Sequence, residues 1–116
     1  MFNANLDIAH FEASTGEAAK LLRALGNERR LMILCQLADG ERSVSEILPL
    51  VGLSQSALSQ HLAVLRQEGI VATRREAQTI WYRIADPAAL KVMTTLAEIF
   101  CPTEPDDDRI DSTFSR

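Results

Sequence analysis

The chain has 116 residues, 47% of them hydrophobic, and a formal net charge of −4 at pH 7. This length fits one compact domain and is too short for two ordinary ones. Aliphatic residues far outnumber aromatic ones, which favours a helical globular protein over a disordered or all-β one. No apolar run reaches membrane-spanning length and the start lacks the features of a signal peptide, so we expect a cytoplasmic protein.

The negative charge is concentrated at the C-terminal end of the chain. Residues 102–116 hold a net charge of −3, which leaves −1 for residues 1–101. Between residues 54 and 85 the arginines outnumber the glutamates, so the acidic total does not exclude binding to nucleic acid. We predict a flexible segment over residues 1–14, a folded domain over residues 15–101 and a disordered acidic tail, with both ends dispensable for DNA binding.

Two helices are predicted at the start of the folded domain. The first has Thr15 as its N-cap, apolar residues at helical spacing and Gly26 at its end. Asn27 is placed to cap the second helix, which begins with "ERRLMIL". The spacing i, i+3, i+4 and i+7 predicts that one face of this second helix consists of Leu31, Leu34, Cys35 and Ala38.

Two further helices follow, joined by a tight turn. Ser43 is placed to cap a short helix that Gly52 ends, and Pro49 inside it weakens the last turn. Ser54 caps the next helix, which ends at Gly69. A short helix followed directly by a longer one is the arrangement of a helix-turn-helix motif.

A β-hairpin and a last helix complete the domain. "IVATRR" and "TIWYRIA" are rich in β-branched and aromatic residues and predict two strands, with residues 76–78 at the tip. Asp86 caps a helix that Pro102 ends, and one side of that helix consists of Ala89, Met93, Leu96 and Phe100. The predicted fold is mainly α with a small β-hairpin, a winged helix-turn-helix.

The helix after Ser54 has the composition of a DNA recognition helix. Leu58, Leu62 and Leu65 fall on one face and are predicted to enter the core. A merely solvated opposite face would carry more Lys and Glu, whereas short hydroxyls and amides can reach base edges and phosphates in a major groove. His61 lies at the inner border, where a packing role is expected. The predicted DNA-binding residues of this helix are Ser54, Gln55, Ser56, Ser59 and Gln60.

The hairpin is predicted to act as a wing on the same DNA. Arg74, Arg75 and Gln78 lie near its end, where they can reach a minor groove or the flanking backbone, although charged tips also serve solubility alone. A module with so few cations binds DNA weakly by itself, which favours a homodimer reading two half-sites. We predict dimerisation through the first and last helices, "EAAKLLRAL" and "AALKVMTTLAEIF".

Several of these motifs occur together in one known family. From Leu22 to Cys101 the chain resembles the ArsR/SmtB repressors, through "LLRALGNERRLMIL", "SVSEI", "GLSQSALSQHLAVLRQEGIV" and "WYRI" in that order. The resemblance implies a homodimeric winged-helix repressor that binds double-stranded operator DNA and leaves it when an inducer is sensed.

Many members of the family sense metals, but the residues of those sites are missing here. Where the family pattern has two thiolates, "ERSVSEI" has Ser43 and Ser45, and hydroxyls are poor ligands for soft metals. The last helix contains no histidine, and neither His10 nor His61 forms a metal motif with a cysteine. We therefore predict no metal site and no cofactor.

The two cysteines resemble those of one subgroup, the sulfide- and persulfide-responsive repressors of the BigR type and the related dithiol regulator HlyU. The matching contexts are "RLMILCQLADGE" around Cys35 and "LAEIFC" ending at Cys101. This resemblance implies that reactive sulfur species join the two thiols in a disulfide or polysulfide bridge that weakens operator binding. Judged by its helical spacing alone, a cysteine on an apolar face is usually a small buried hydrophobe.

Other interpretations of the sequence stay open. Peroxide, an electrophile or a metal could act on the same thiols as the inducer. The acidic charge also fits a winged-helix module that binds protein. An enzyme is disfavoured because the chain has no Cys-x-x-Cys pair, no Cys/His couple at recognisable spacing and no glycine-rich phosphate loop.

Overall fold

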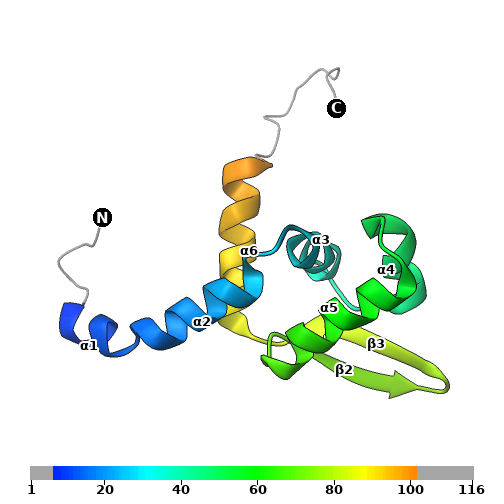
Figure 1. The fold of residues 1–116 in the computed structure, drawn as a ribbon, viewed down its shortest axis with the longest axis horizontal. Coiled ribbons are helices and arrows are strands. Elements are labelled where there is room, and N and C mark those ends of the chain that lie inside the picture. The colour runs from blue at the N-terminus through cyan, green and yellow to red at the C-terminus, as the bar shows by residue number, and fades with distance from the viewer. Residues whose placement is uncertain (1–6, 102–116) are drawn as a thin grey trace.

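A computed structural model describes residues 7–101 and confirms the predicted winged helix-turn-helix. The predicted properties of the acidic tail, and the helix end at Pro102, lie outside the described residues. Figure 1 shows α5 lying across the β2–β3 hairpin, with α6 rising from the base of that hairpin. In chain order the elements are α1 (Ile8–Ala13), α2 (Thr15–Leu25), α3 (Glu28–Leu37), β1 (Arg42–Ser43), α4 (Val44–Val51), α5 (Gln55–Gln67), β2 (Val71–Glu76), β3 (Thr79–Ile84) and α6 (Pro87–Phe100).

Four of the predicted N-caps are confirmed by side-chain hydrogen bonds. Asn27, Ser54 and Asp86 each accept from a backbone N–H in the first turn of the following helix. Ser43 forms a reciprocal capping box: its hydroxyl accepts from the Glu46 N–H, and the Glu46 carboxylate accepts from the Ser43 N–H. Such caps satisfy N–H groups that have no partner inside the helix, so they fix where each helix starts.

The predicted start of the first helix was wrong. Thr15 is the first residue of α2 rather than its cap, and its hydroxyl donates to the Glu12 carbonyl at 3.0 Å. Glu12 belongs to α1, a helix within the segment for which we expected no regular structure. This helix spans six residues, is capped by Asp7 and buries no side chain, so it left no periodic apolar signal in the sequence.

The helix-turn-helix tolerates the internal proline of α4. This helix continues past Pro49 to Val51, because Ile47 and Val51 on either side are fully buried and hold the last turn in the core. Gly52 then ends α4 with φ of 66°, a left-handed conformation that glycine adopts without strain.

The sheet has three strands in the order β1-β3-β2, whereas only the hairpin was predicted. Strand β1 pairs antiparallel with β3, with Arg42 opposite Tyr82 and Ser43 opposite Trp81. At two residues it is too short to show an alternating pattern. The hairpin tip is tighter than predicted, since Glu76 pairs with Thr79 and Ala77 takes the left-handed conformation with φ of 56°.

One aliphatic core holds these elements together. Helix α5 contributes the predicted Leu58, Leu62 and Leu65, and α6 contributes Ala89 and Met93. The buried face of α3 differs from the prediction and consists of Ile33, Leu34 and Leu37. Within residues 7–101 the structure has no helix long and apolar enough to span a bilayer.

Candidate DNA-binding surface and thiol pair

The outer face of α5 is polar and exposed, as the leucine spacing predicted. Gln55, Ser56, Ser59 and Gln60 are all exposed, while the three core leucines are at most 1% exposed. Ser54 has a structural role, because its hydroxyl accepts from the Ala57 N–H at 3.1 Å. His61 is half-buried at the border of the core. The remaining side chains are available to meet base edges in a major groove.

The two arginines of the wing lie on opposite faces of the hairpin. Side chains alternate along a strand, and residues paired across two strands share a face. Arg74 pairs with Trp81, whereas Arg75 pairs with Ile80, on the same face as Tyr82. Tyr82 packs against the core and lines a groove together with residues of α5. Arg75 therefore shares the face of the hairpin that adjoins α5, and Arg74 lies on the other face.

Arg74 is committed to contacts within the protein. Its guanidinium lies 2.8 Å from one Glu41 carboxylate oxygen and 3.1 Å from Glu76, and it stacks over the Trp81 ring with 5.7 Å to the centroid. Hydrogen bonding from Arg74 lowers the pKa of Glu41, and the two carboxylates raise that of Arg74. Glu41 lies 33 residues away in the chain, in the loop before β1, so local sequence patterns could not predict this network.

Arg75 and Gln78 remain candidates for contact with DNA. Both are exposed, and neither side chain forms a hydrogen bond or ion pair with another residue of the described region. Of the three predicted wing contacts, Arg74 instead fixes the hairpin to the loop after α3. Arg75 and Gln78 have donors that can bind a phosphate or a base.

The two cysteines are free thiols, and both residues are exposed. Cys35 was predicted on the inner face of α3, but that face is formed by its neighbours, and Cys35 points away from the core residues. Partial burial raises the pKa of the Cys35 thiol above its usual value, and the charge of a Cys101 thiolate raises it further. Cys101 caps the C-terminal end of α6. The fold therefore brings the two sulfurs within electrostatic reach of each other.

The residues described contain no group of three or more His, Cys, Asp and Glu side chains placed to hold a metal ion. The Ser43 and Ser45 hydroxyls, at the positions of the family thiolates, lie 3.1 Å apart and hydrogen-bond to each other. The Ser43 hydroxyl also accepts from the Glu46 N–H at the start of α4, so these hydroxyls form hydrogen bonds within the protein.

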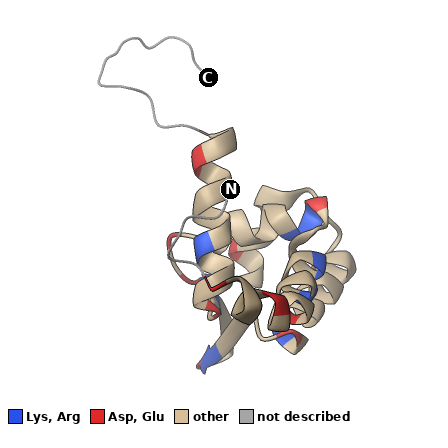
Figure 2. Ribbon diagram, turned by 90° about the vertical axis from the view of Figure 1, so that its left-hand side faces the viewer, with Lys and Arg blue, Asp and Glu red and all other residues tan. Residues whose placement is uncertain are grey.

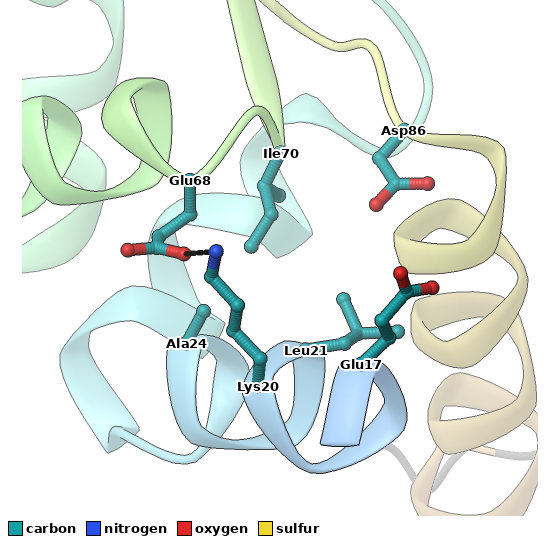
Figure 3. Close-up of a pocket in the computed structure, with 7 residues that line it drawn as sticks. All are labelled: Glu17, Lys20, Leu21, Ala24, Glu68, Ile70 and Asp86. Atoms are coloured by element: carbon teal, nitrogen blue, oxygen red, sulfur yellow. Dashed lines mark ion pairs between the residues drawn. The ribbon is translucent and has the colours of Figure 1, made fainter. Parts of the chain in front are cut away.

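A depression of about 230 Å³ lies between α2, the turn after α5 and the start of α6 (Figure 3). Lys20 crosses it to pair with Glu68 at 3.7 Å, and the Asp86 carboxylate caps α6 through the Ala88 N–H. The space is smaller than the usual small-molecule pocket. Of its polar groups, Lys20 and Glu68 pair with each other and Asp86 caps α6, which indicates a joint between helices more than a ligand site.

Helices α2 and α6 expose apolar side chains. Leu22 is 59% exposed, and Ile99 and Phe100 at the end of α6 are 61% and 74% exposed. Figure 2 shows that the ribbon of α6 carries little charge; Lys91 and Glu98 are its charged residues. Phe100 was predicted to share one side of the helix with Ala89 and Met93; those two are buried in the core, whereas Phe100 belongs to an exposed apolar end. Exposed apolar side chains of this size commonly mark a protein interface.

A helix-turn-helix, a hairpin wing beside it and an uncharged polar outer face on α5 together define a winged helix-turn-helix protein of the class that binds DNA. Residues 27–73 match the family described as bacterial regulatory protein, arsR family. The chain belongs to this ArsR family of DNA-binding transcription regulators.

Its relatives include a transcriptional activator and a transcriptional repressor. The transcriptional activator HlyU of Vibrio cholerae is 45% identical over 98 residues, which cover 84% of this chain and 91% of HlyU. The crystal structure of the transcriptional repressor BigR from Xylella fastidiosa is 41% identical with a TM-score of 0.78, over 83% of this chain and 98% of that one. These matches confirm the resemblance to the BigR and HlyU subgroup, whose members are regulators rather than enzymes.

A homodimer also occurs among the structural neighbours. The winged helix-turn-helix DNA-binding domain of Mb0332 from Mycobacterium bovis, described as homodimeric, is 32% identical. Its TM-score is 0.67, over 84% of this chain and 89% of that one.

Proposed function

We propose that the protein is a dimeric repressor that binds operator DNA through α5 and the wing, and that it is released when reactive sulfur species bridge Cys35 and Cys101. The observation that carries the proposal is the proximity of the two free thiols. They are 66 positions apart in the chain (101 minus 35), yet a charge on one sulfur changes the pKa of the other. Both residues are exposed, so a small reactant can reach them.

The pKa of Cys35 decides the order of reaction that we propose. A thiolate rather than a thiol attacks sulfur, and Cys35 is held more in its thiol form than an ordinary cysteine. We therefore assign the first attack to Cys101 and the resolving attack to Cys35.

The chemistry needs no cofactor. The Cys101 thiolate attacks the outer sulfur of a persulfide RS–SH, which forms a Cys101 persulfide and releases RS⁻. Cys35 loses its proton to water and attacks the inner sulfur of that persulfide, so the disulfide forms as HS⁻ leaves. The two thiols are oxidised, and the transferred sulfur is reduced to sulfide. A second sulfur transferred before closure gives a trisulfide by the same displacement.

A bridge at Cys35 acts on an element that supports the DNA-binding surface. Helix α3 packs Ile33, Leu34 and Leu37 in the same core as the leucines of α5. The carbonyl of Gln36, the next residue after Cys35, accepts from Arg42 at 2.7 Å, and Arg42 belongs to β1, which pairs with the wing strand β3. A displacement of α3 toward the end of α6 is therefore passed on to the wing.

The dimer in this proposal forms through α2 and α6. The exposed Leu22, Ile99 and Phe100 supply its apolar surface, and the homodimeric Mb0332 domain has the same fold. Because α6 carries both this surface and Cys101, a bridge to α3 changes how each DNA-binding unit is held against its partner. A difference of about 2.8 kcal/mol between the two arrangements lowers DNA affinity roughly a hundredfold.

Fluorescence anisotropy on the protein's own promoter DNA tests the proposal. Fully reduced protein is compared with protein treated with glutathione persulfide, and Cys35→Ser and Cys101→Ser proteins are treated in the same way. We expect tight binding by the reduced protein, a loss of roughly a hundredfold on treatment, and no loss in either variant. Tight binding that persulfide leaves unchanged would reject the sensor but keep the DNA-binding protein. An absence of promoter binding by reduced protein would reject both.

Transcription in vitro from the same promoter separates repression from activation. Repression predicts that added reduced protein lowers the transcript and that persulfide restores it. A transcript that rises with reduced protein would instead match the direction named for HlyU.

A further inference from the structure

A groove runs between α5 and β3 on the side of the molecule that faces DNA in the proposed function. Its volume is about 420 Å³, and it is lined by Ser59, Leu62, Ala63, Arg66, Gln67 and Tyr82. Arg66 and Tyr82 were not among the residues predicted to bind DNA. Arg66 lies two helical turns after Ser59 on the same stripe of α5, and Tyr82 lies on β3, so the groove extends from the outer face of the helix to the sheet.

We propose that this groove holds one sugar-phosphate strand of the DNA, with Arg66 and Tyr82 as its phosphate-binding residues. The inference rests on the proposed function, because it takes α5 to occupy a major groove and the hairpin tip to reach the neighbouring minor groove. Adjacent major and minor grooves of a duplex are separated by one backbone strand. A protein that places an element in each of them must let that strand pass between the two elements, and here the groove lies between α5 and the hairpin.

The charges around the groove fit a phosphate. Arg66 is exposed, and its guanidinium has no ion pair or hydrogen bond with any other described residue. Arg74, by contrast, is neutralised by Glu41 and Glu76 on the opposite face of the hairpin. Arg75 shares the hairpin face of Tyr82 and extends the positive charge toward the tip. The groove thus borders the part of the wing whose arginine is free to bind an anion.

The remaining lining groups suit the two parts of a backbone strand. The Gln67 amide and the Tyr82 hydroxyl are donors of the kind that contact phosphate oxygens. The exposed Ala63 offers apolar surface beside them, against which a deoxyribose can pack. None of these contacts reads a base, so they position the protein and add affinity on every sequence.

The test is the salt dependence of DNA binding by reduced full-length protein, for promoter DNA and for an unrelated duplex. Arg66→Gln removes the cation, and Tyr82→Phe removes the hydroxyl but keeps the ring in the core. Lys91→Gln, on the exposed side of α6, is the control for the loss of one charge per chain. Thermal unfolding and the oligomeric state of each variant are measured alongside, so that misfolding is recognised.

Each phosphate contact contributes about 0.9 to the slope of log K against log salt concentration. Loss of Arg66 from both halves of a dimer should therefore flatten the slope by about 2 and weaken binding to both duplexes alike. Tyr82→Phe should weaken both by roughly tenfold for each half of the dimer, as expected for one hydrogen bond to a charged group, and Lys91→Gln should leave the slope unchanged.

Two other results would overturn the groove assignment. In the first, the Arg66→Gln and Tyr82→Phe proteins are folded and bind DNA with the same affinity and the same salt slope as the unmodified protein, whose binding depends strongly on salt. In the second, the variants lose affinity for promoter DNA but not for the unrelated duplex, which would mean that these residues contact bases. If the unmodified protein binds neither duplex, the proposed function fails first, and that result is distinct from both.

Discussion

A bridge between Cys35 and Cys101 should make the protein more resistant to unfolding, and the size of the effect follows from their separation. Joining residues 66 positions apart (101 minus 35) restricts the unfolded chain by roughly 4 kcal/mol in the loop-entropy description. The folded protein realises this gain in full only if the bridge is formed without strain. The proposed mechanism requires strain, since a bridge that fitted the DNA-binding shape would leave DNA affinity unchanged.

We therefore expect a net stabilisation of about 2 kcal/mol, below the unstrained value. For a domain of this size, 1 kcal/mol raises the unfolding midpoint by roughly 4 to 8 °C, so the bridged protein should unfold about 8 to 16 °C higher. Calorimetry of reduced and persulfide-treated protein measures the shift. Mass spectrometry of the same sample shows whether two hydrogens are lost, or whether sulfur is added as well.

Treated Cys35→Ser protein is the matched control, because it keeps Cys101 and a similar side chain on α3. Its midpoint should not rise on treatment. One result would refute the idea that the bridge works through strain. Mass spectrometry would show the bridge in the treated protein, the free energy of unfolding would rise by about 4 kcal/mol, and DNA affinity would stay the same.

Three further predictions concern single groups. Burial and the charge of Cys101 both raise the pKa of Cys35, so the rate at which iodoacetamide alkylates Cys35 should increase with pH. In Cys101→Ser protein the midpoint of this pH dependence should move to lower pH, and an unmoved midpoint would show that the two thiols do not interact. Ser43→Ala removes half of the capping box of α4 and should cost about 1 kcal/mol in urea unfolding, whereas a neutral result would mean that the Glu46 contact alone holds the cap. Arg75→Gln should flatten the salt dependence of DNA binding more than Arg74→Gln, whose guanidinium is already neutralised within the protein; equal effects would contradict the assignment of the two arginines to opposite faces.

The helix starts were predictable because each depends on a few neighbouring residues. Asn27, Ser43, Ser54 and Asp86 all cap helices where local chemistry placed them. The outer face of α5 was predictable for the same reason, because a repeat of three leucines fixes which side turns inward. Local spacing failed at Cys35, where the helix turns a neighbouring set of aliphatic residues to the core.

Contacts between distant segments could not be predicted from one sequence. The Glu41–Arg74 pair joins a loop to the wing across 33 residues, and the two free thiols, on α3 and at the end of α6, lie close enough to interact electrostatically. The groove beside Arg66 and Tyr82 exists only once β3 lies against α5. Arg74 and Arg75 are adjacent and look equivalent in the sequence, but strand pairing places them on opposite faces of the hairpin, where they have different partners.

The outer face of α5 has a consequence for how the protein can change its target. Gln55, Ser59 and Gln60 are exposed, and their side chains hold no other part of the described region in place, so replacing them should alter stability by no more than about 0.5 kcal/mol. The leucines on the inner face, the caps and the wing anchor at Arg74 stay as they are. In the proposed function, new operator preferences can therefore arise one substitution at a time, with no change to α2, α6 or the two cysteines.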